Sequence, residues 1–328
     1  MTRSFMSVAA LATILVTLDA PSNAQSLSAQ APSPGATDVR PDAIGQPRFR
    51  HGVDLVSLDV CVRDATGRLI TDLSAGDFQV AENGRLQSVS IVMPSGAVPL
   101  TVVLLIDHSA SMHGPKLARA QEAARLFASR LRPEDRLEII AFNQQAKRVL
   151  GFSDDLSRAP AALDSIRAWG TTGLYEALLV AANDIVRARA SLEPETREVI
   201  VLLSDGEDTA SIVGFDEALP VLRRSGALVY ALSLRTDAKG VWLGATWPLL
   251  TMARDTGGRT LGVPILDKLP ALYAEIAAEV RHLYRIGYVS NDDRRDGQWR
   301  QVAVRVLTPD ARVRTRAGYY AAAQPKAR

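Results

Sequence analysis

The sequence predicts an α/β protein with a doubly wound, mostly parallel sheet, joined to a smaller all-β module built from the N- and C-terminal flanks. Between residues 99 and 282, short apolar runs alternate with stretches whose apolar residues recur every three or four positions, as in parallel strands followed by helices. Residues 53–92 and 284–306, on either side of that region, show strand-like alternation. With 328 residues, 47% of them hydrophobic, the chain is long and apolar enough for both folded parts.

The N-terminus has the three regions of a secretory signal peptide, which we assign to residues 1–24. Arg3 precedes an apolar run from Val8 to Leu18, and small and polar residues lead to a cleavage site after Ala24. The alternative, a membrane anchor, is less favoured because the run is shorter than the roughly 20 residues that span a bilayer. We therefore expect an exported protein, periplasmic or extracellular, with no stable membrane span after cleavage.

The next segment, 25–47, is rich in Ser, Ala, Pro and Gly and lacks apolar periodicity, which is typical of a flexible linker. The β module is expected at 48–98 and 283–321, around an α/β domain at 99–282, with a short tail at 322–328. Each flank alone is too small to bury a core, so we expect the two to share one interior. Its apolar residues would be Leu58, Val60, Phe78, Val80, Val302, Val304 and Val306.

Within the α/β domain, continuous apolar runs such as 102–106 and 199–203 are typical of strands buried on both faces of a sheet. Pro133 ends the first amphipathic stretch, because proline cannot continue a helix. The expected strands are 102–106, 137–142, 148–152, 199–203 and 228–234. The expected helices are 117–131, 156–169, 174–189, 215–224, 249–255 and 269–280.

Charge and cysteine content exclude two classes of protein. The formal net charge of +2 creates no strong field for nucleic acid, so we expect no nucleic-acid partner. Cys61 is the single cysteine, so no intramolecular disulfide can form. Because Cys61 alternates with valines in a strand-like run, we expect it to be a small buried apolar group.

Polar residues follow the apolar strands at three places where a doubly wound sheet binds its ligands. Asp107, Ser109 and Ser111 come after the first strand, a Thr171-Thr172 pair precedes a helix, and Asp205 follows the 199–203 strand. Two carboxylates and three hydroxyls suit a hard divalent cation, Mg²⁺ best, with Mn²⁺ or Ca²⁺ as alternatives. Neutral hydroxyls leave the ion much of its charge, so it can bind a carboxylate from a partner.

This pattern resembles the metal-ion-dependent adhesion site of von Willebrand factor type A domains over roughly residues 99–282. The segment Thr172-Gly173-Leu174-Tyr175-Glu176-Ala177 lines up with the family's pattern, which favours Thr172 over Thr171. The resemblance implies direct metal contact by Ser109, Ser111 and Thr172, with Asp107 and Asp205 acting largely through water. Ala110 departs from the glycine that is frequent in the family. The flanks resemble bacterial exported proteins related to von Willebrand factor A, through residues 77–84, 284–288 and 318–320.

Several neighbouring residues have ordinary structural interpretations. We expect His108 and His113 to be solvent-facing loop residues rather than zinc ligands, and Glu207 and Asp208 to be solvated. Glu176 is expected to favour the N-terminus of its helix through the dipole. For Trp242 and Trp247, packing against a helix is favoured over contact with a partner.

These features predict an exported, metal-dependent protein-binding or adhesion protein whose partner presents Asp or Glu to Mg²⁺. An enzyme is not expected, because the sequence contains no Gly-x-Ser-x-Gly elbow, Walker loop or His-Glu-x-x-His segment. Two alternatives stay open: a scaffolding protein with a stabilising metal and, with less support, a metal-assisted hydrolase.

Overall fold

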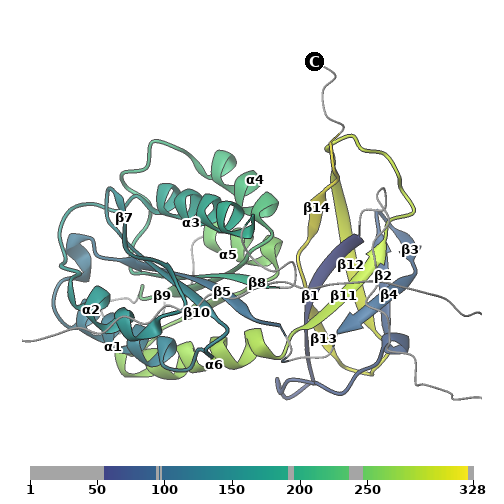
Figure 1. Cartoon of the computed structure of the whole chain (residues 1–328), viewed down its shortest axis with the longest axis horizontal. Helices are drawn as coiled ribbons and strands as arrows, with labels where there is room; N and C mark the ends of the chain where they lie inside the picture. The colour runs from purple at the N-terminus through teal and green to yellow at the C-terminus, as the bar shows by residue number, and fades with distance from the viewer. Residues whose placement is uncertain (1–54, 94–95, 97, 191–195, 236–246, 324–328) are drawn as a thin grey trace, which may run out of the picture. The chain divides into compact units, whose positions relative to one another are not determined.

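The computed structural model describes residues 55–93, 96, 98–190, 196–235 and 247–323 (Figure 1). The predicted signal peptide (1–24), the predicted linker (25–47) and Trp242 lie outside the described residues. None of the described helices is long and apolar enough to cross a membrane.

The α/β part has a central six-stranded sheet in the order β10-β9-β8-β5-β6-β7. All neighbouring strands in it are parallel except β6 and β7. Its strands are β5 (Leu100–Asp107), β6 (Arg136–Phe142), β7 (Ala146–Ser153), β8 (Arg197–Ser204), β9 (Leu228–Ser233) and β10 (Thr260–Gly262). The helices are α1 (Pro115–Ala128), α2 (Ala159–Asp164), α3 (Leu174–Arg189), α4 (Phe215–Ser225), α5 (Trp247–Thr256) and α6 (Leu269–Arg281). The predicted fold class is confirmed.

Two layers of helices cover the sheet, with α1, α2 and α6 on one face and α3, α4 and α5 on the other (Figure 1). Along β5, Val102, Leu104 and Ile106 pack into the first layer, whereas Val103 and Leu105 pack into the second. Because successive side chains of a strand point to opposite faces, a strand covered on both faces needs an unbroken apolar run. This explains the pattern at 102–106.

The helix expected at 156–169 is shorter than predicted, since α2 ends at Asp164. The chain beyond it uses its backbone groups elsewhere: the Trp169 N–H donates to the His108 carbonyl at 2.8 Å, and the Gly170 carbonyl accepts from the Ala110 N–H at 2.9 Å. These tertiary hydrogen bonds replace helical ones and dock the segment against the loop after β5. The short strand β10 was not predicted from the sequence.

The β module consists of two four-stranded sheets, in the orders β13-β1-β11-β4 and β14-β12-β2-β3. The N-terminal flank contributes β1 (Leu55–Arg63), β2 (Phe78–Glu82), β3 (Arg85–Gln87) and β4 (Val89–Met93). The C-terminal flank contributes β11 (Tyr284–Val289), β12 (Trp299–Val306), β13 (Arg312–Arg314) and β14 (Gly318–Tyr320). Strand β11 pairs with both β1 and β4, and β12 pairs with β2. Each sheet therefore combines strands from both flanks.

The two sheets enclose one apolar interior that contains all seven residues predicted for it. Phe78 from one flank meets Tyr284 from the other edge to face, with ring centroids 5.1 Å apart. Cys61 is buried, as predicted. Neither flank closes an interior alone, because both sheets lack their central partners without the other half.

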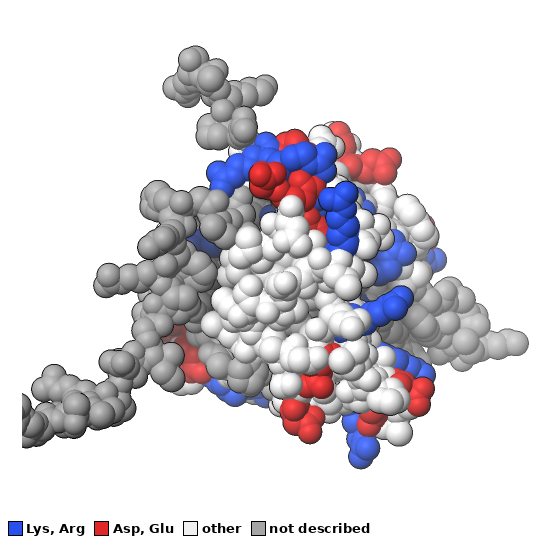
Figure 2. All heavy atoms as spheres, turned by 90° about the vertical axis from the view of Figure 1, so that its right-hand side faces the viewer, with Lys and Arg blue, Asp and Glu red and all other residues white. Residues whose placement is uncertain are grey.

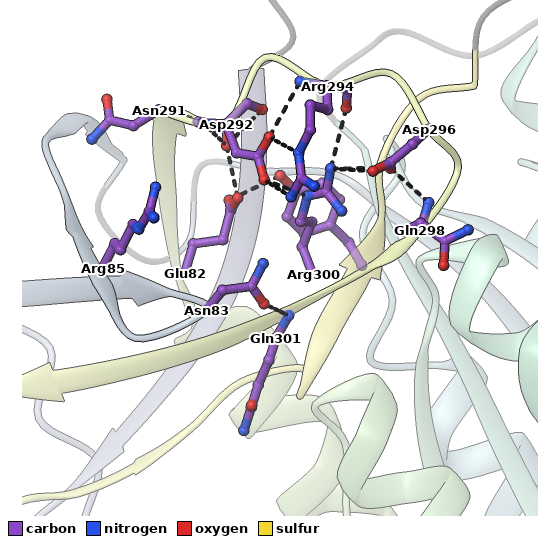
Figure 3. Close-up of polar contacts among 12 residues, drawn as sticks. Glu82, Asn83, Arg85, Asn291, Asp292, Arg294, Asp296, Gln298, Arg300 and Gln301 are labelled. Atoms are coloured by element: carbon purple, nitrogen blue, oxygen red, sulfur yellow. Dashed lines mark hydrogen bonds and ion pairs between the residues drawn. The ribbon is translucent and has the colours of Figure 1, made fainter.

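A cluster of ion pairs orders the loop 290–298 above this module (Figure 3). The nearly buried Arg300 pairs with Asp292 at 3.3 Å and with Asp296 at 3.0 Å. Asn83, in the β2–β3 turn, accepts a hydrogen bond from the Gln301 N–H at 2.9 Å. Its φ of 47° is one that Asn tolerates better than most residues. These contacts attach the C-terminal flank to the N-terminal turn.

The outer face of the β module has few charges at its centre. Figure 2 shows a broad area without Lys, Arg, Asp or Glu there, bordered by side chains of both signs.

Buried charges connect the module to the α/β part. The Glu279 carboxylate of α6 is fully buried and pairs with Arg63 of β1 at 2.5 Å, with Arg259 at 3.0 Å, and with Arg314 of β13. The Tyr230 hydroxyl also donates to it, at 2.7 Å. One carboxylate therefore joins strands from both flanks to the α/β domain.

Candidate metal centre

Four of the five predicted site residues, all except Thr172, lie at or directly after the carboxyl ends of two neighbouring strands. Strands β5 and β8 are parallel partners in register from Leu100 and Arg197 to Ile106 and Leu203. The loops that begin at Asp107 and Asp205 therefore leave the sheet side by side, at the edge where ligands bind in this architecture.

Asp107 is held in place by two hydrogen bonds. Its buried carboxylate accepts from the Ser204 hydroxyl at 2.5 Å and from the Ser109 N–H at 2.8 Å. Burial raises the pKa of Asp107, and the hydrogen bonds from Ser204 and Ser109 oppose that rise. The carboxylate thus has a defined orientation and fixes the backbone of the loop that carries Ser109.

Three further side-chain oxygens, those of Ser109, Ser111 and Asp205, form a chain of contacts beside Asp107. The Ser109 and Ser111 hydroxyl oxygens are 3.1 Å apart, and the Ser111 hydroxyl donates to Asp205 Oδ1 at 2.6 Å. Residues 94 positions apart in the sequence are thereby in direct contact. The structure brings four of the five predicted ligands into one connected group.

Thr172 lies beside this group. Its carbonyl accepts from the backbone N–H groups of Thr209 and Ala210, at 2.8 and 3.0 Å. Its hydroxyl faces Gly206, where an added Cβ would be 3.5 Å away, and it forms no hydrogen bond to the other four residues in the described structure. Thr172 is buried, whereas Thr171 is exposed. Gly206 leaves open the space between Asp205 and the Thr172 hydroxyl.

The donor chemistry fits a hard divalent cation. All the candidate side-chain donors are oxygens, and the hydroxyls among them are neutral, a set that suits a hard divalent cation. Among the described residues, no group of three or more His, Cys, Asp or Glu side chains is arranged to hold a metal.

Sequence reasoning missed two residues of this region, Lys116 and Ser204. The Lys116 ammonium, in the first turn of α1, pairs with Asp205 and also donates to the Ser111 carbonyl at 3.2 Å. Ser204 ends β8 and orients Asp107. The available signal was weak: a basic residue soon after the Ser-x-Ser loop, and a polar residue that ends an apolar strand.

The expectation that Asp208 is merely solvated is wrong. Its carboxylate accepts from the N–H groups of Leu174 and Tyr175, at 2.7 and 3.3 Å, and from the Ser211 hydroxyl at 2.6 Å. Asp208 therefore supplies, from another loop, the capping acceptor that the N-terminus of α3 needs. By contrast, Glu207 is exposed and pairs with Arg235.

The expectation of a solvent-facing His108 is also wrong, because this residue is buried. Its Nδ1 is 2.7 Å from the Arg167 carbonyl, and the centroid of its ring is 6.3 Å from that of the Trp169 ring. The cause is the segment after α2, which folds over the ring. His113 is exposed, as predicted.

Glu176 has the structural role that we favoured. It lies in the first turn of α3, and it accepts from the Ile212 N–H at 3.1 Å. Trp247 contacts Phe215, at the start of α4, with ring centroids 4.9 Å apart, but it is 66% exposed, so the helix covers it only in part.

Comparison with known proteins shows which family the central part of the chain is similar to. Residues 102–207 match the family model of the von Willebrand factor type A domain. A segment of 144 residues, 42% of this chain, is 30% identical to the inter-alpha-trypsin inhibitor heavy chain H4 of Bos taurus, of which it covers 16%. A segment of 113 residues, 34% of this chain, is 32% identical to the uncharacterized protein sll0103 of Synechocystis, of which it covers 26%. The chain thus spans only a small part of these relatives.

The fold is also similar to that of a solved structure. The von Willebrand factor type A protein from Catenulispora acidiphila superposes with a TM-score of 0.50 over 84% of this chain and 76% of that one, at 14% identity. From the matched family model, we conclude that residues 102–207 belong to a von Willebrand factor type A domain.

Proposed function

We propose that this protein is an exported, metal-dependent binding protein in which Asp107, Ser109, Ser111, Thr172 and Asp205 hold Mg²⁺, with Mn²⁺ or Ca²⁺ as alternatives. The von Willebrand factor type A domain is an adhesion and protein-interaction module, so the proposed partner is a protein. The observation that carries the proposal is the direct contact of the Ser109, Ser111 and Asp205 oxygens at the strand ends.

The bound ion would supply positive charge for a carboxylate of the partner, an Asp or Glu side chain. The chain's own residues prepare that site. Ser204 orients the Asp107 carboxylate, which in turn holds the Ser109 backbone. Asp208 fixes the start of α3, directly after Thr172 and Gly173. No residue is assigned a catalytic role, and the protein is proposed not to be an enzyme.

The proposed organisation follows the sequence. Residues 1–24 are the signal peptide, 25–47 the linker and 322–328 a tail. The segments 48–98 and 283–321 form the β module, into which the type A domain, 99–282, is inserted. Pairing of β1 with β11 and of β2 with β12 supports this insertion. The protein would act in the periplasm or outside the cell, without a stable membrane span.

A capture experiment tests the function. The full-length mature protein is used as bait for envelope and medium proteins, with Mg²⁺ and with a chelator. We expect magnesium-dependent capture that Ser111→Ala abolishes, because the exposed Ser111 hydroxyl bridges Ser109 and Asp205. The matched control is Ser88→Ala, at an exposed position outside the site.

The outcome also separates the alternatives. Loss of capture in chelator while the circular dichroism spectrum persists supports recognition, whereas unfolding in chelator supports a structural metal. Capture that is equal with and without Mg²⁺, and equal for Ser111→Ala, contradicts the proposal. Metal-dependent turnover of a captured partner would indicate the hydrolase.

Lys116 makes a further result predictable. The Lys116 ammonium pairs with the Asp205 carboxylate, so its positive charge repels an incoming cation. A unit charge about 5–6 Å from a divalent ion costs about 1.5 kcal/mol in a water-like medium, or about tenfold in affinity. Lys116→Met should therefore bind Mn²⁺ about tenfold more tightly by calorimetry. Lys147→Met, an exposed lysine on β7, should leave the affinity unchanged, and weaker binding by Lys116→Met would show that Lys116 instead organises the site.

A further inference from the structure

A second candidate site lies near the start of β8, at the opposite end of the central sheet's strands from the metal centre. It is a cleft of about 690 Å³ between the β module and the α/β domain. Its lining includes Thr196 and Glu198 at the start of β8, whereas the metal centre follows the end of that strand. Strand β14 and helix α4, which lie side by side in Figure 1, form further parts of the wall.

The lining of the cleft is strongly basic. It contains two carboxylates, Asp59 and Glu198, and five arginines: Arg189, Arg223, Arg224, Arg285 and Arg316. Three of the arginines have carboxylate partners, in the pairs Arg189–Glu198 at 2.7 Å, Arg223–Asp255 at 2.5 Å and Arg285–Asp59 at 3.3 Å. Each of these three arginines therefore has a carboxylate partner that the fold supplies.

Arg224 and Arg316 differ from the others, since neither pairs with a carboxylate in the described part of the chain. The Arg224 guanidinium lies over the Tyr320 ring, 4.2 Å from its centroid. Arg316 lies 5.5 Å from the Tyr319 ring and donates to the Ser57 carbonyl at 2.8 Å. Aromatic contact leaves the in-plane N–H groups of a guanidinium available for an oxyanion.

Of the two guanidinium groups, that of Arg316 is in the less favourable environment. The Arg316 Nε is buried and has no hydrogen-bond partner among the residues that the structure describes. Burial lowers the pKa of Arg316, and the positive charge of Arg189 adds to that effect, although Asp59 opposes it. A buried donor that lacks a hydrogen-bond acceptor is unfavourable, so an oxyanion that accepts from this Nε would stabilise the arrangement.

We propose that this cleft binds a small molecule that carries an oxyanion, a carboxylate or a phosphate, with Arg224 and Arg316 as its anchoring cations. A volume of about 690 Å³ is within the range of metabolite-sized sites, which is roughly 300–1,000 Å³, and exceeds what a lone ion needs. Tyr319 and Tyr320 provide walls for the rest of the ligand. The site does not depend on the metal centre.

The test uses the arginine Nε–Hε signals in the NMR spectrum of the ¹⁵N-labelled full-length mature protein. Inorganic phosphate and succinate are titrated separately, at matched ionic strength. We expect saturable shifts of the Arg224 and Arg316 signals, and a loss of affinity of about tenfold or more in Arg224→Gln and in Arg316→Gln. Tighter phosphate identifies a phosphorylated ligand, and tighter succinate a carboxylate ligand; either supports the proposal.

Arg305→Gln, an exposed arginine of β12 outside the cleft, is the matched control and should bind like the wild type. If Arg316→Gln fails to fold, Arg224→Gln decides, because the contact found for its guanidinium among the described residues is the one with the Tyr320 ring. Shifts that never saturate, or that are equal in all variants, overturn the proposal. Ser111→Ala should keep phosphate or succinate binding, so failure of the metal proposal is distinguished from failure of this one.

Discussion

Replacing Asp107 by alanine is expected to weaken Mn²⁺ and Mg²⁺ binding by about 100-fold, the upper range for residues that orient metal ligands. The Asp107 carboxylate is a buried negative charge beside the hydroxyl pair, and it accepts a hydrogen bond from the Ser109 N–H at 2.8 Å. Its loss removes both charge and orientation. Isothermal titration calorimetry with Mn²⁺ measures the effect directly.

Two further variants make this result specific. Asp107→Asn keeps the shape and an acceptor for Ser109 but loses the charge, so its affinity should be intermediate. Asp154→Ala, at an exposed position after β7, should bind Mn²⁺ like the wild type. Equal affinity for wild type and Asp107→Ala would refute the assigned metal site.

The largest loss of stability is expected from Glu279→Ala. The substitution leaves Arg63, Arg259 and Arg314 without their shared buried counter-charge. Breaking a buried ion pair by removing one partner costs about 3–5 kcal/mol. Urea denaturation should therefore show the free energy of unfolding lowered by about that amount, and β1 and β13 should lose protection from amide exchange first.

Glu275→Gln is the matched control on the same helix. Its carboxylate also pairs with Arg259, at 2.5 Å, but its side chain is 42% exposed, so the expected loss is below about 1 kcal/mol. If the two variants lose similar amounts of unfolding free energy, the ion pairs of Glu279 stabilise the protein no more than those of an exposed carboxylate.

The effect of Glu279 should also depend on pH. Burial raises the pKa of Glu279, but the charges of Arg314 and Arg259 outweigh this, and the net pKa is below its usual value. A carboxyl whose pKa is lower in the folded state stabilises fully above its unfolded pKa, about 4.3. The stability gap between wild type and Glu279→Ala should thus be constant near neutrality and shrink as the pH falls below about 4. A gap that widens in acid would contradict this assignment.

Local patterns in the sequence were sufficient for the fold class and for the order of the site residues. The unbroken apolar run at 102–106 requires a strand covered on both faces, because side chains alternate along a strand. The spacing of Asp107, Ser109 and Ser111 places them on one loop directly after that strand. The similar position of Asp205, after the neighbouring apolar strand, made a common location predictable, since parallel strands end at the same edge.

Long-range contacts decided the rest, because no periodicity encodes which distant side chains meet. Lys116 on Asp205, Asp208 at the start of α3, and the burial of His108 all depend on how separate loops fold over one another. The same holds for Arg224 and Arg316, which line one cleft although 92 positions separate them in the sequence. A side chain's local sequence determines its element, but its charge partners and its exposure are properties of the packed molecule.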